Sequence, residues 1–263
     1  EVYKRAAVIC KNKVLTIRTL DIGGDKDIPY MGLTKESNPF LGYRAIRFCL
    51  GRIDVFTTQL RAILRASAYG NIRIMLPLIT GVSEVRSVRT ILQNVMRELD
   101  SKEIPYDKDI LLGVMIETPA ACMLADILAK EADFFSIGTN DLTQYTIAVD
   151  RGNENVAYLY SAFHPAVLRS VKRIIECAKR ENIEVGMCGE AAGNPAMIPL
   201  LLAFGLDEFS VTASKVLETR KNIASWTMKE AAAVTDTVMG MSTEKEVSTY
   251  LSDYIAAKMS SGK

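Results

Sequence analysis

Short runs of apolar residues alternate along this chain with longer stretches in which apolar positions recur every three or four residues. The short runs lie near residues 14–17, 72–78, 110–116, 134–138, 184–187 and 208–211. Runs of this length bounded by turn residues are typical of buried strands, whereas the spacing within 83–99 and 166–179 predicts amphipathic helices. Strands that alternate with helices predict an α/β fold with a parallel sheet.

The number of strands points toward one particular α/β architecture. Six strands, with a possible short one near 42–44, approach the eight of a (β/α)8 TIM barrel. The chain opens on a predicted helix at 1–7 with no strand before it, so we expect the first barrel strand to be lacking here. The stretch 228–258 has a helical pattern, and we expect it to pack outside the barrel or against a partner. Residues 1–263 are interpreted as one domain.

Polar or glycine-rich residues follow several of the predicted strands. The stretch D-F-F-S-I-G-T-N-D-L-T-Q, residues 133–144, passes from an apolar run into Asn140 and Asp141. Another run ends in Glu117, and a third ends in Cys188. Because the carboxyl ends of parallel strands commonly carry the functional residues of such folds, this recurrence predicts chemistry at the strand ends.

Glu117 and Asp141 are the candidates for binding a metal ion. Two carboxylates that follow different strands can share a hard divalent cation, and Mg²⁺ typically takes one or two protein carboxylates together with water and phosphate oxygens. The structural alternative is that each carboxylate caps the helix that follows it. On spacing alone the two readings are equally favoured.

Candidate anion-binding residues are arginines, because a planar guanidinium matches carboxylate and phosphate groups bidentately. Arg18, Arg44, Arg73 and Arg151 are the candidates. Arg18 is the strongest, because it leads into T-L-D-I-G-G-D-K, where two glycines permit close backbone approach and Lys26 adds a charge. For any single arginine, a solvated or structural role is the alternative.

Cys188 lies in the segment V-G-M-C-G-E, flanked by glycine at a strand end. A free thiol can transfer a proton near neutral pH, although an isolated cysteine is more often a buried, inert residue. Cys49, Cys122 and Cys177 fall on predicted helices and are interpreted as packing residues. The only histidine, His164, precedes Pro165 at a predicted helix start and is interpreted as structural.

Composition and charge exclude several classes of protein. The 32 Lys and Arg residues almost balance the 31 Asp and Glu residues, which gives a net charge of +1 and no overall attraction for nucleic acid or an anionic membrane. No apolar run is long enough to span a membrane, and no secretory signal is expected at the start. The five cysteines form no CxxC pair, which favours reduced thiols and a cytoplasmic location.

Six motifs, in order, resemble the C-terminal domain of enzyme I of the bacterial sugar phosphotransferase system across essentially the whole chain. They are Arg18–Lys26, Asn38–Arg44, Glu117–Ala120, Ile137–Gln144, Asp150–Arg151 and Gly186–Glu190. The resemblance implies a (β/α)8 barrel that binds phosphoenolpyruvate with Mg²⁺, releases pyruvate and forms a homodimer through this domain.

The resemblance also implies roles for individual residues. Arg18 and Arg44 match phosphate-binding arginines, and Lys26 matches a basic residue near the phosphate. Glu117 and Asp141 match the Mg²⁺ ligands. Asn140 and Arg151 match residues that hold the substrate. Cys188 matches the acid that protonates the pyruvate enolate.

Two parts of the enzyme I family lie outside this sequence: a further phosphate-binding arginine on the first barrel strand, and an N-terminal domain whose histidine carries the phosphoryl group to the protein HPr. We therefore expect the isolated chain to be inactive without its histidine domain. Pyruvate phosphate dikinase and phosphoenolpyruvate synthase, which share the barrel, are the nearest enzymatic alternatives. A ligand-binding dimerisation module without turnover is the alternative from another class.

Overall fold

The computed structural model describes residues 1–23 and 36–261, with side chains through Lys258. Lys26 lies outside the described residues. The chain divides into two compact units, of which the first contains Glu1–Met115 and Lys130–Phe134 and the second contains Ile116–Ala129 and Phe135–Lys263. Each unit is described by itself.

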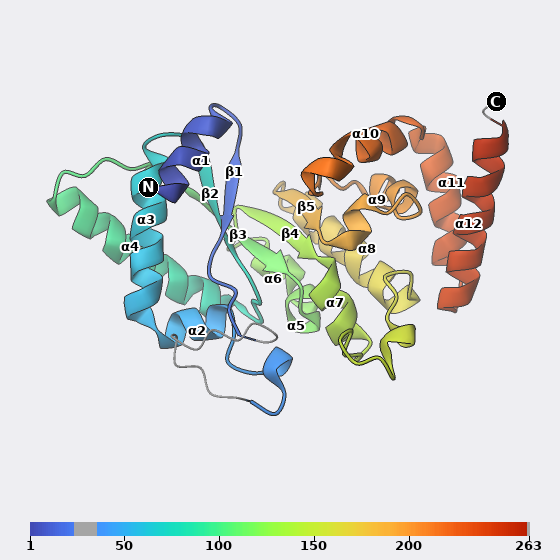
Figure 1. Ribbon diagram of the computed structural model, residues 1–263, viewed down its shortest axis with the longest axis horizontal. Helices are drawn as coiled ribbons and strands as arrows, with labels where there is room; N and C mark the ends of the chain where they lie inside the picture. Colours follow the sequence, from blue (N-terminus) through green and yellow to red (C-terminus); the bar gives the residue numbers. More distant parts are fainter. Residues whose placement is uncertain (24–35, 262–263) are drawn as a thin grey trace. The chain divides into compact units, whose positions relative to one another are not determined.

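The first unit is built on parallel strands in sequence order (Figure 1). Strands β1 (Leu15–Arg18), β2 (Ile72–Leu76) and β3 (Leu111–Ile116) pair side by side, with Ile17 opposite Ile74. These three strands therefore follow the order β1, β2, β3 and run parallel to one another. The predicted α/β fold with a parallel sheet is therefore confirmed.

The two longer helices of the first unit each bury one apolar face, as amphipathic spacing predicts. The helices of this unit are α1 (Val2–Cys10), α2 (Ile46–Gly51), α3 (Ile53–Ser67) and α4 (Val82–Ser101), with a short 3₁₀ turn, η2 (Pro39–Leu41). The buried residues of α4 are Val85, Val88, Leu92, Val95 and Leu99, which follow the three-to-four spacing of one helix face. Helix α3 packs against both α1 and α4.

Close packing inside the first unit depends on one glycine in β3. A Cβ at Gly113 would lie 2.4 Å from the ring of Phe134, so only glycine leaves room for that ring. The guanidinium carbon of Arg73, on β2, lies 4.1 Å from the centroid of the same ring. Gly113 thus fits the core of this unit for a packing reason.

The second unit contains the remaining three strands, which are β4 (Phe134–Gly138), β5 (Glu184–Cys188) and β6 (Glu208–Phe209). β5 and β6 pair in parallel, with Met187 opposite Phe209. The helices are α5 (Pro119–Met123), α6 (Ala125–Leu128), α7 (Thr139–Thr146), α8 (Pro165–Arg180), α9 (Ile198–Phe204), α10 (Val216–Ala224), α11 (Met228–Met239) and α12 (Glu244–Ser261). Short 3₁₀ turns are η3 (Ala157–Leu159), η4 (Glu190–Gly193) and η5 (Ala213–Lys215).

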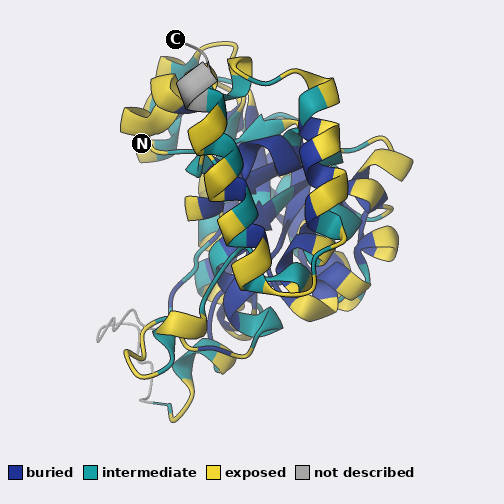
Figure 2. Cartoon of the chain, turned by 90° about the vertical axis from the view of Figure 1, so that its right-hand side faces the viewer, coloured by how far each residue is buried: buried dark blue, intermediate teal, exposed yellow. Residues whose placement is uncertain are grey.

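Burial in the second unit follows the predicted pattern. Figure 2 shows buried strands and helices that carry a buried stripe beside an exposed one. His164 caps the N-terminus of α8, because its Nδ1 accepts a hydrogen bond from the Ala166 N–H at 3.2 Å. The structural interpretation of His164 is therefore confirmed.

The structure differs from the sequence prediction at two places, residues 42–44 and the helical stretch 228–258. Residues 42–44 form no strand among the described residues, because the carbonyls of Leu41 and Gly42 accept hydrogen bonds from Arg47 after the η2 turn. The helical tail divides into α11 and α12, since Thr243 and Glu246 cap a new helix start.

Candidate functional site

In the first unit, one carboxylate binds two of the candidate arginines, Arg18 and Arg44. Arg44 Nη2 lies 3.0 Å from Asp21 Oδ1, and both side chains are 7% exposed. Arg18, the last residue of β1, places Nη2 3.6 Å from Asp21 Oδ2 with its side chain 42% exposed. Two guanidiniums against one carboxylate give a net charge of +1, which suits an anionic ligand.

Local backbone geometry explains how this Arg18–Asp21–Arg44 cluster forms. Gly23 has φ +95°, and a Cβ there would lie 2.8 Å from Arg44 Cβ and 2.9 Å from the Tyr43 carbonyl oxygen. Only glycine therefore allows this segment to run so close to Arg44. The Ala45 N–H donates to the Ile22 carbonyl at 3.1 Å and holds the two segments together.

Cys49 lies next to this cluster and is a packing residue, as predicted. Its side chain is fully buried, and its thiol lies 3.7 Å from the Leu20 carbonyl. Burial, followed by the nearby Asp21 carboxylate, raises the pKa of the Cys49 thiol to about 12. The thiol is therefore neutral in the physiological range.

Arg73 is used inside the fold rather than in this cluster. Its Nε donates to Thr16 Oγ1 at 2.7 Å, its guanidinium stacks on Phe134, and the residue is 7% exposed. These contacts favour the structural alternative for Arg73.

In the second unit, Asp141 and Arg151 form an ion pair. Asp141 lies in the first turn of α7, and its Oδ1 is 3.1 Å from Arg151 Nη1. Asp141 is buried, and the Arg151 side chain is one third exposed. The Arg151 N–H also donates to Gln144 Oε1 at 3.1 Å, so α7 fixes both the backbone and the side chain of Arg151.

Asn140, the residue before Asp141, is held through both its backbone and its side chain. The Tyr160 hydroxyl donates to the Asn140 carbonyl at 3.1 Å, and the Glu190 N–H donates to Asn140 Oδ1 at 3.4 Å. Burial raises the pKa of Tyr160, while Arg151 and the Thr143 hydroxyl oppose that shift. The hydroxyl therefore stays protonated and remains a donor.

Cys188 lies beside the start of α7. The Thr139 hydroxyl donates to the Cys188 carbonyl at 3.0 Å, and Ser136 Oγ lies 3.7 Å from Cys188 Sγ. Cys188 is half-buried, unlike the buried Cys122 and Cys177, whose pKa values are raised chiefly by burial. The structure thus brings together Asn140, Asp141, Arg151 and Cys188 around the first turns of α7.

Gly189 permits this arrangement. It has φ +94°, and a Cβ there would lie 2.5 Å from Thr139 Oγ1 and 3.0 Å from Asn140 Oδ1. Any side chain would push against the two residues that begin α7.

The alternative that Glu117 caps the following helix is wrong, because Thr118 occupies that position. Asp141 does lie in the first turn of α7, but it is not the capping residue. Thr118 caps α5, accepting from the Ala121 N–H at 3.1 Å, while Glu117 follows β3 and is 2% exposed. Gly138 occupies the capping position of α7, so Asp141 is a first-turn residue whose carboxylate binds Arg151.

Glu117 and Asp141 have the donor chemistry of a Mg²⁺ site. Both are buried carboxylates of the second unit, and hard oxygen donors suit Mg²⁺, which requires only one or two of them. Within residues 1–23 and 36–261, no group of three or more His, Cys, Asp or Glu side chains is arranged to hold a metal. The two carboxylates fit the ion without forming a complete protein cage.

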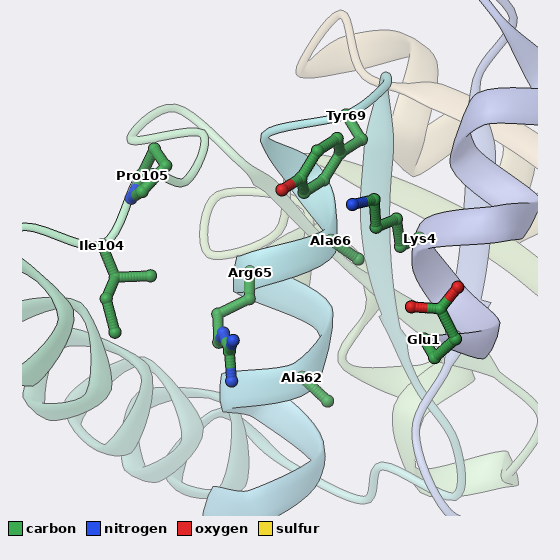
Figure 3. Close-up of a pocket in the computed structure, with 8 residues that line it drawn as sticks. All are labelled: Glu1, Lys4, Ala62, Arg65, Ala66, Tyr69, Ile104 and Pro105. Atoms are coloured by element: carbon green, nitrogen blue, oxygen red, sulfur yellow. The ribbon is translucent and has the colours of Figure 1, made fainter.

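Each unit carries a surface pocket. The pocket of the second unit has a volume of about 600 Å³ and is lined by Asn140, Gly189, Glu190, Gly193, Asn194, Pro195, Ser210, Val211, Thr212 and Lys215. It therefore adjoins Asn140 and the turn after Cys188. The pocket of the first unit, about 370 Å³, lies between α1 and α3 with Lys4 Nζ 4.0 Å from the Tyr69 ring centroid (Figure 3). Among the candidate site residues that the structure describes, none lines the pocket of the first unit.

Four residues of these sites received no role from the sequence. Asp21 lies within the same motif as Arg18, and Ser136 is the one polar position of the apolar strand β4, so both carried a signal. Thr139 and Tyr160 act through hydrogen bonds that no spacing in the sequence reveals.

The parallel sheet and its polar strand ends define an α/β protein with residues suited to an anionic ligand and a hard cation. Residues 1–228 match the family of the PEP-binding domain of PEP-utilising enzymes, and the chain belongs to that family. PEP is phosphoenolpyruvate.

Curated relatives named phosphoenolpyruvate-protein phosphotransferase are similar over almost the whole chain. The protein from Geobacillus stearothermophilus is 50% identical over 249 residues, covering 95% of this chain and 43% of the relative. That from Bacillus subtilis (strain 168) is 48% identical over 253 residues, covering 96% and 44%. The chain thus spans less than half the length of these relatives.

Among solved structures, a citrate lyase from Burkholderia xenovorans LB400 aligns with a TM-score of 0.49 and 16% identity, covering 78% of this chain and 69% of that one. A likeness at this level does not establish a shared fold. Within the described part of the chain, no helix is both long enough and apolar enough to cross a bilayer.

Proposed function

We propose that this chain is the phosphoenolpyruvate-binding part of a phosphoenolpyruvate-protein phosphotransferase. The observation that carries the proposal is the family match over residues 1–228, together with curated relatives of that name that cover almost the whole chain. In the proposed reaction, phosphoenolpyruvate gives its phosphoryl group to a histidine on an N-terminal domain, and pyruvate is released. HPr then receives the phosphoryl group.

Arg18 and Arg44 are assigned to the phosphate of the ligand, with Lys26 as a further basic residue. The pairing of both arginines with Asp21 supports this assignment, because it fixes their positions before a ligand arrives. Guanidiniums held in place can offset the charge of a transferring phosphoryl group without reorganising during the reaction.

Glu117 and Asp141 are assigned as ligands of Mg²⁺, and Asn140 and Arg151 as substrate-binding residues. When bound, Mg²⁺ supplies charge neutralisation at the phosphate oxygens. The Asp141–Arg151 pair supports this assignment, because a carboxylate and a guanidinium 3.1 Å apart can hold a cation and an anion next to each other.

Cys188 is assigned as the acid that protonates the pyruvate enolate. Loss of the phosphoryl group leaves an enolate, and transfer of the thiol proton to its methylene carbon forms a C–H bond and breaks the S–H bond. Pyruvate leaves, and the thiolate regains a proton from water. The half-buried position of Cys188 beside Thr139, at the start of α7, supports this role.

The wider setting is also inferred from the resemblance. We propose that the sheet belongs to a (β/α)8 barrel, which its parallel strands in sequence order support. The protein acts as a homodimer in the cytoplasm, as part of a sugar transport system. One alternative is the barrel of a pyruvate phosphate dikinase or phosphoenolpyruvate synthase, which would require a nucleotide-binding domain. The other alternative is a module that binds the ligand without turnover.

Calorimetric titration of the chain with phosphoenolpyruvate, with Mg²⁺ and then with chelator, tests the binding proposal. We expect saturable binding that depends on Mg²⁺ and that weakens roughly tenfold or more in Arg18→Ala, because a hydrogen bond to a charged group is lost. Arg52→Ala, which removes an exposed guanidinium that pairs with Asp54, is the matched control. Equal binding by both variants would remove Arg18 from the site.

Exchange of pyruvate methyl protons tests the role of Cys188 without a histidine domain. By microscopic reversibility, an acid that protonates the enolate also removes a proton from the methyl group of pyruvate. In D₂O with Mg²⁺, the chain should replace these protons by deuterium, as followed by NMR, and Cys188→Ala should lose the exchange. Exchange that persists in Cys188→Ala would assign the proton to another group.

A further inference from the structure

We propose that Ser136 is a positioning residue for Cys188, holding the thiol in place and stabilising the thiolate that forms when Cys188 gives up its proton. This proposal rests on the proposed function for its catalytic consequence. The contact itself rests only on the structure, in which Ser136 Oγ donates to Cys188 Sγ at 3.7 Å within the second unit.

The strand pattern of β4 places this hydroxyl. Successive side chains of a strand point to opposite faces, so Phe135 and Ile137 share one face and Ser136 takes the other. Phe135 and Ile137 are fully buried, whereas Ser136 is half-buried. Ser136 is the only side chain of β4 with a hydroxyl, and it meets the one cysteine that ends a strand.

The direction of the hydrogen bonds explains what the hydroxyl can do. Cys188 Sγ lies 3.7 Å from the Ile137 carbonyl oxygen and donates its own proton there, while it accepts from Ser136. When that proton moves to the methylene carbon of the enolate, the sulfur becomes a thiolate and the carbonyl contact is lost. The Ser136 O–H remains and becomes a charge-assisted hydrogen bond, which is the stronger kind.

The alternative is that Ser136 is a half-buried structural residue whose hydroxyl donates to Cys188 only because it needs a hydrogen-bond partner. Under that reading, Ser136 would have no effect on the ionisation of the thiol. Charged groups on the neighbouring elements include Glu190 of η4, Asp141 of α7 with its partner Arg151, Glu208 of β6 and Lys215 of η5. None of them is altered when Ser136 is replaced, so a change in thiol ionisation would report on the hydroxyl.

The first test measures how the rate of iodoacetamide alkylation of Cys188 depends on pH. Cys10→Ser serves as the background, because the remaining thiols, Cys49, Cys122 and Cys177, are buried. Peptide mass spectrometry identifies the modified residue. We expect Ser136→Ala to move the midpoint of the profile to higher pH by roughly one unit or more, because the thiolate loses a donor.

Matched variants separate this effect from a general disturbance. Ser136→Thr keeps the hydroxyl and should restore the profile, and Ser87→Ala makes the same change at an exposed position of α4 and should leave it unaltered. Should Ser136→Ala fail to fold, Ser136→Gly removes the same hydroxyl and should give the same shift. A midpoint unchanged in the hydroxyl-free variants would overturn the proposal.

The second test measures pyruvate methyl exchange in the same variants. We expect the exchange rate in Ser136→Ala to fall roughly tenfold, with pyruvate affinity unchanged and with recovery in Ser136→Thr. A rate equal to that of the unaltered chain would overturn the catalytic consequence. If the unaltered chain shows no exchange, the function proposed for Cys188 fails, and the alkylation profile still decides whether Ser136 acts on the thiol.

Discussion

Arg44 and Asp21 form a buried ion pair, with 3.0 Å between Nη2 and Oδ1 and only 7% of each side chain exposed. The two residues are separated by 23 positions in the sequence. A charge this deeply buried is costly unless its partner is present. Asp21 therefore has a structural role for the first unit as well as a positioning role for the two arginines.

Asp21→Asn should destabilise the chain by about 3 kcal/mol, because it removes the charged partner at 3.0 Å from the buried Arg44 guanidinium. Urea unfolding followed by circular dichroism measures the change. The matched control is Asp54→Asn in the fully exposed Arg52–Asp54 pair, which should alter the midpoint little. Equal effects from the two variants would show that burial of the first pair contributes no stability.

The sequence predicted the strands well, because their signal is local. Each of the six apolar runs became a strand, since a run bounded by turn residues has few other ways to bury itself. Helix α8 likewise begins at the predicted place, after His164. The prediction of a possible strand at 42–44 was wrong, because Arg47 binds the carbonyls of Leu41 and Gly42 after the η2 turn.

The candidate site residues could be named from the sequence by residue type, but the contacts between their side chains could not be predicted. Arg18, Asp141 and Cys188 were singled out because they stand at strand ends. The bridging of two arginines by Asp21, and the hydroxyl of Ser136 on Cys188, depend on which residues the fold brings together. Sequence separation alone carries no information about such contacts.

Gly189→Ala should displace the turn that carries Cys188. Gly189 has φ +94°, which disfavours any L side chain, and the new Cβ would lie 2.5 Å from Thr139 Oγ1. We expect a loss of about 2 kcal/mol of stability and a large loss of pyruvate exchange. Gly193→Ala is the control, since its Cβ would meet its nearest neighbour, Val211 Cγ1, at 3.4 Å. Thermal unfolding and the exchange assay distinguish the two variants.

Asp141→Asn should abolish the Mg²⁺ dependence of phosphoenolpyruvate binding, because a neutral amide is a poor ligand for a hard cation. Calorimetric titrations with and without chelator measure this dependence. Asp150→Asn changes a neighbouring exposed carboxylate, whose Oδ1 accepts from the Gly152 N–H, and should leave the dependence intact. A preserved Mg²⁺ effect in Asp141→Asn would place the metal elsewhere.

Packing of the last helix should depend on pH through Glu230. The Thr227 N–H, and then the Lys258 ammonium, lower the pKa of the Glu230 carboxyl from 4.5 to about 2. Because the pKa is lower in the folded chain, this stabilising contribution is complete above pH 4.5 and is lost as pH falls toward about 2. Glu230 belongs to α11 and Lys258 to α12, so acid should loosen the contact between these helices.

Trp226, the only tryptophan of the chain, can report this change. Its ring stacks on Tyr254 of α12 at 5.7 Å between centroids and lies 4.3 Å from Lys258 Nζ. We expect its fluorescence to change between pH 4.5 and about 2, and we expect Glu230→Gln to remove most of that change. Glu218→Gln alters the exposed pair between Glu218 of α10 and Lys215 of η5 and should leave the transition in place. A transition that is identical in Glu230→Gln would mean that another carboxylate governs the packing of α12, because Glu230 would then carry no proton-linked contact.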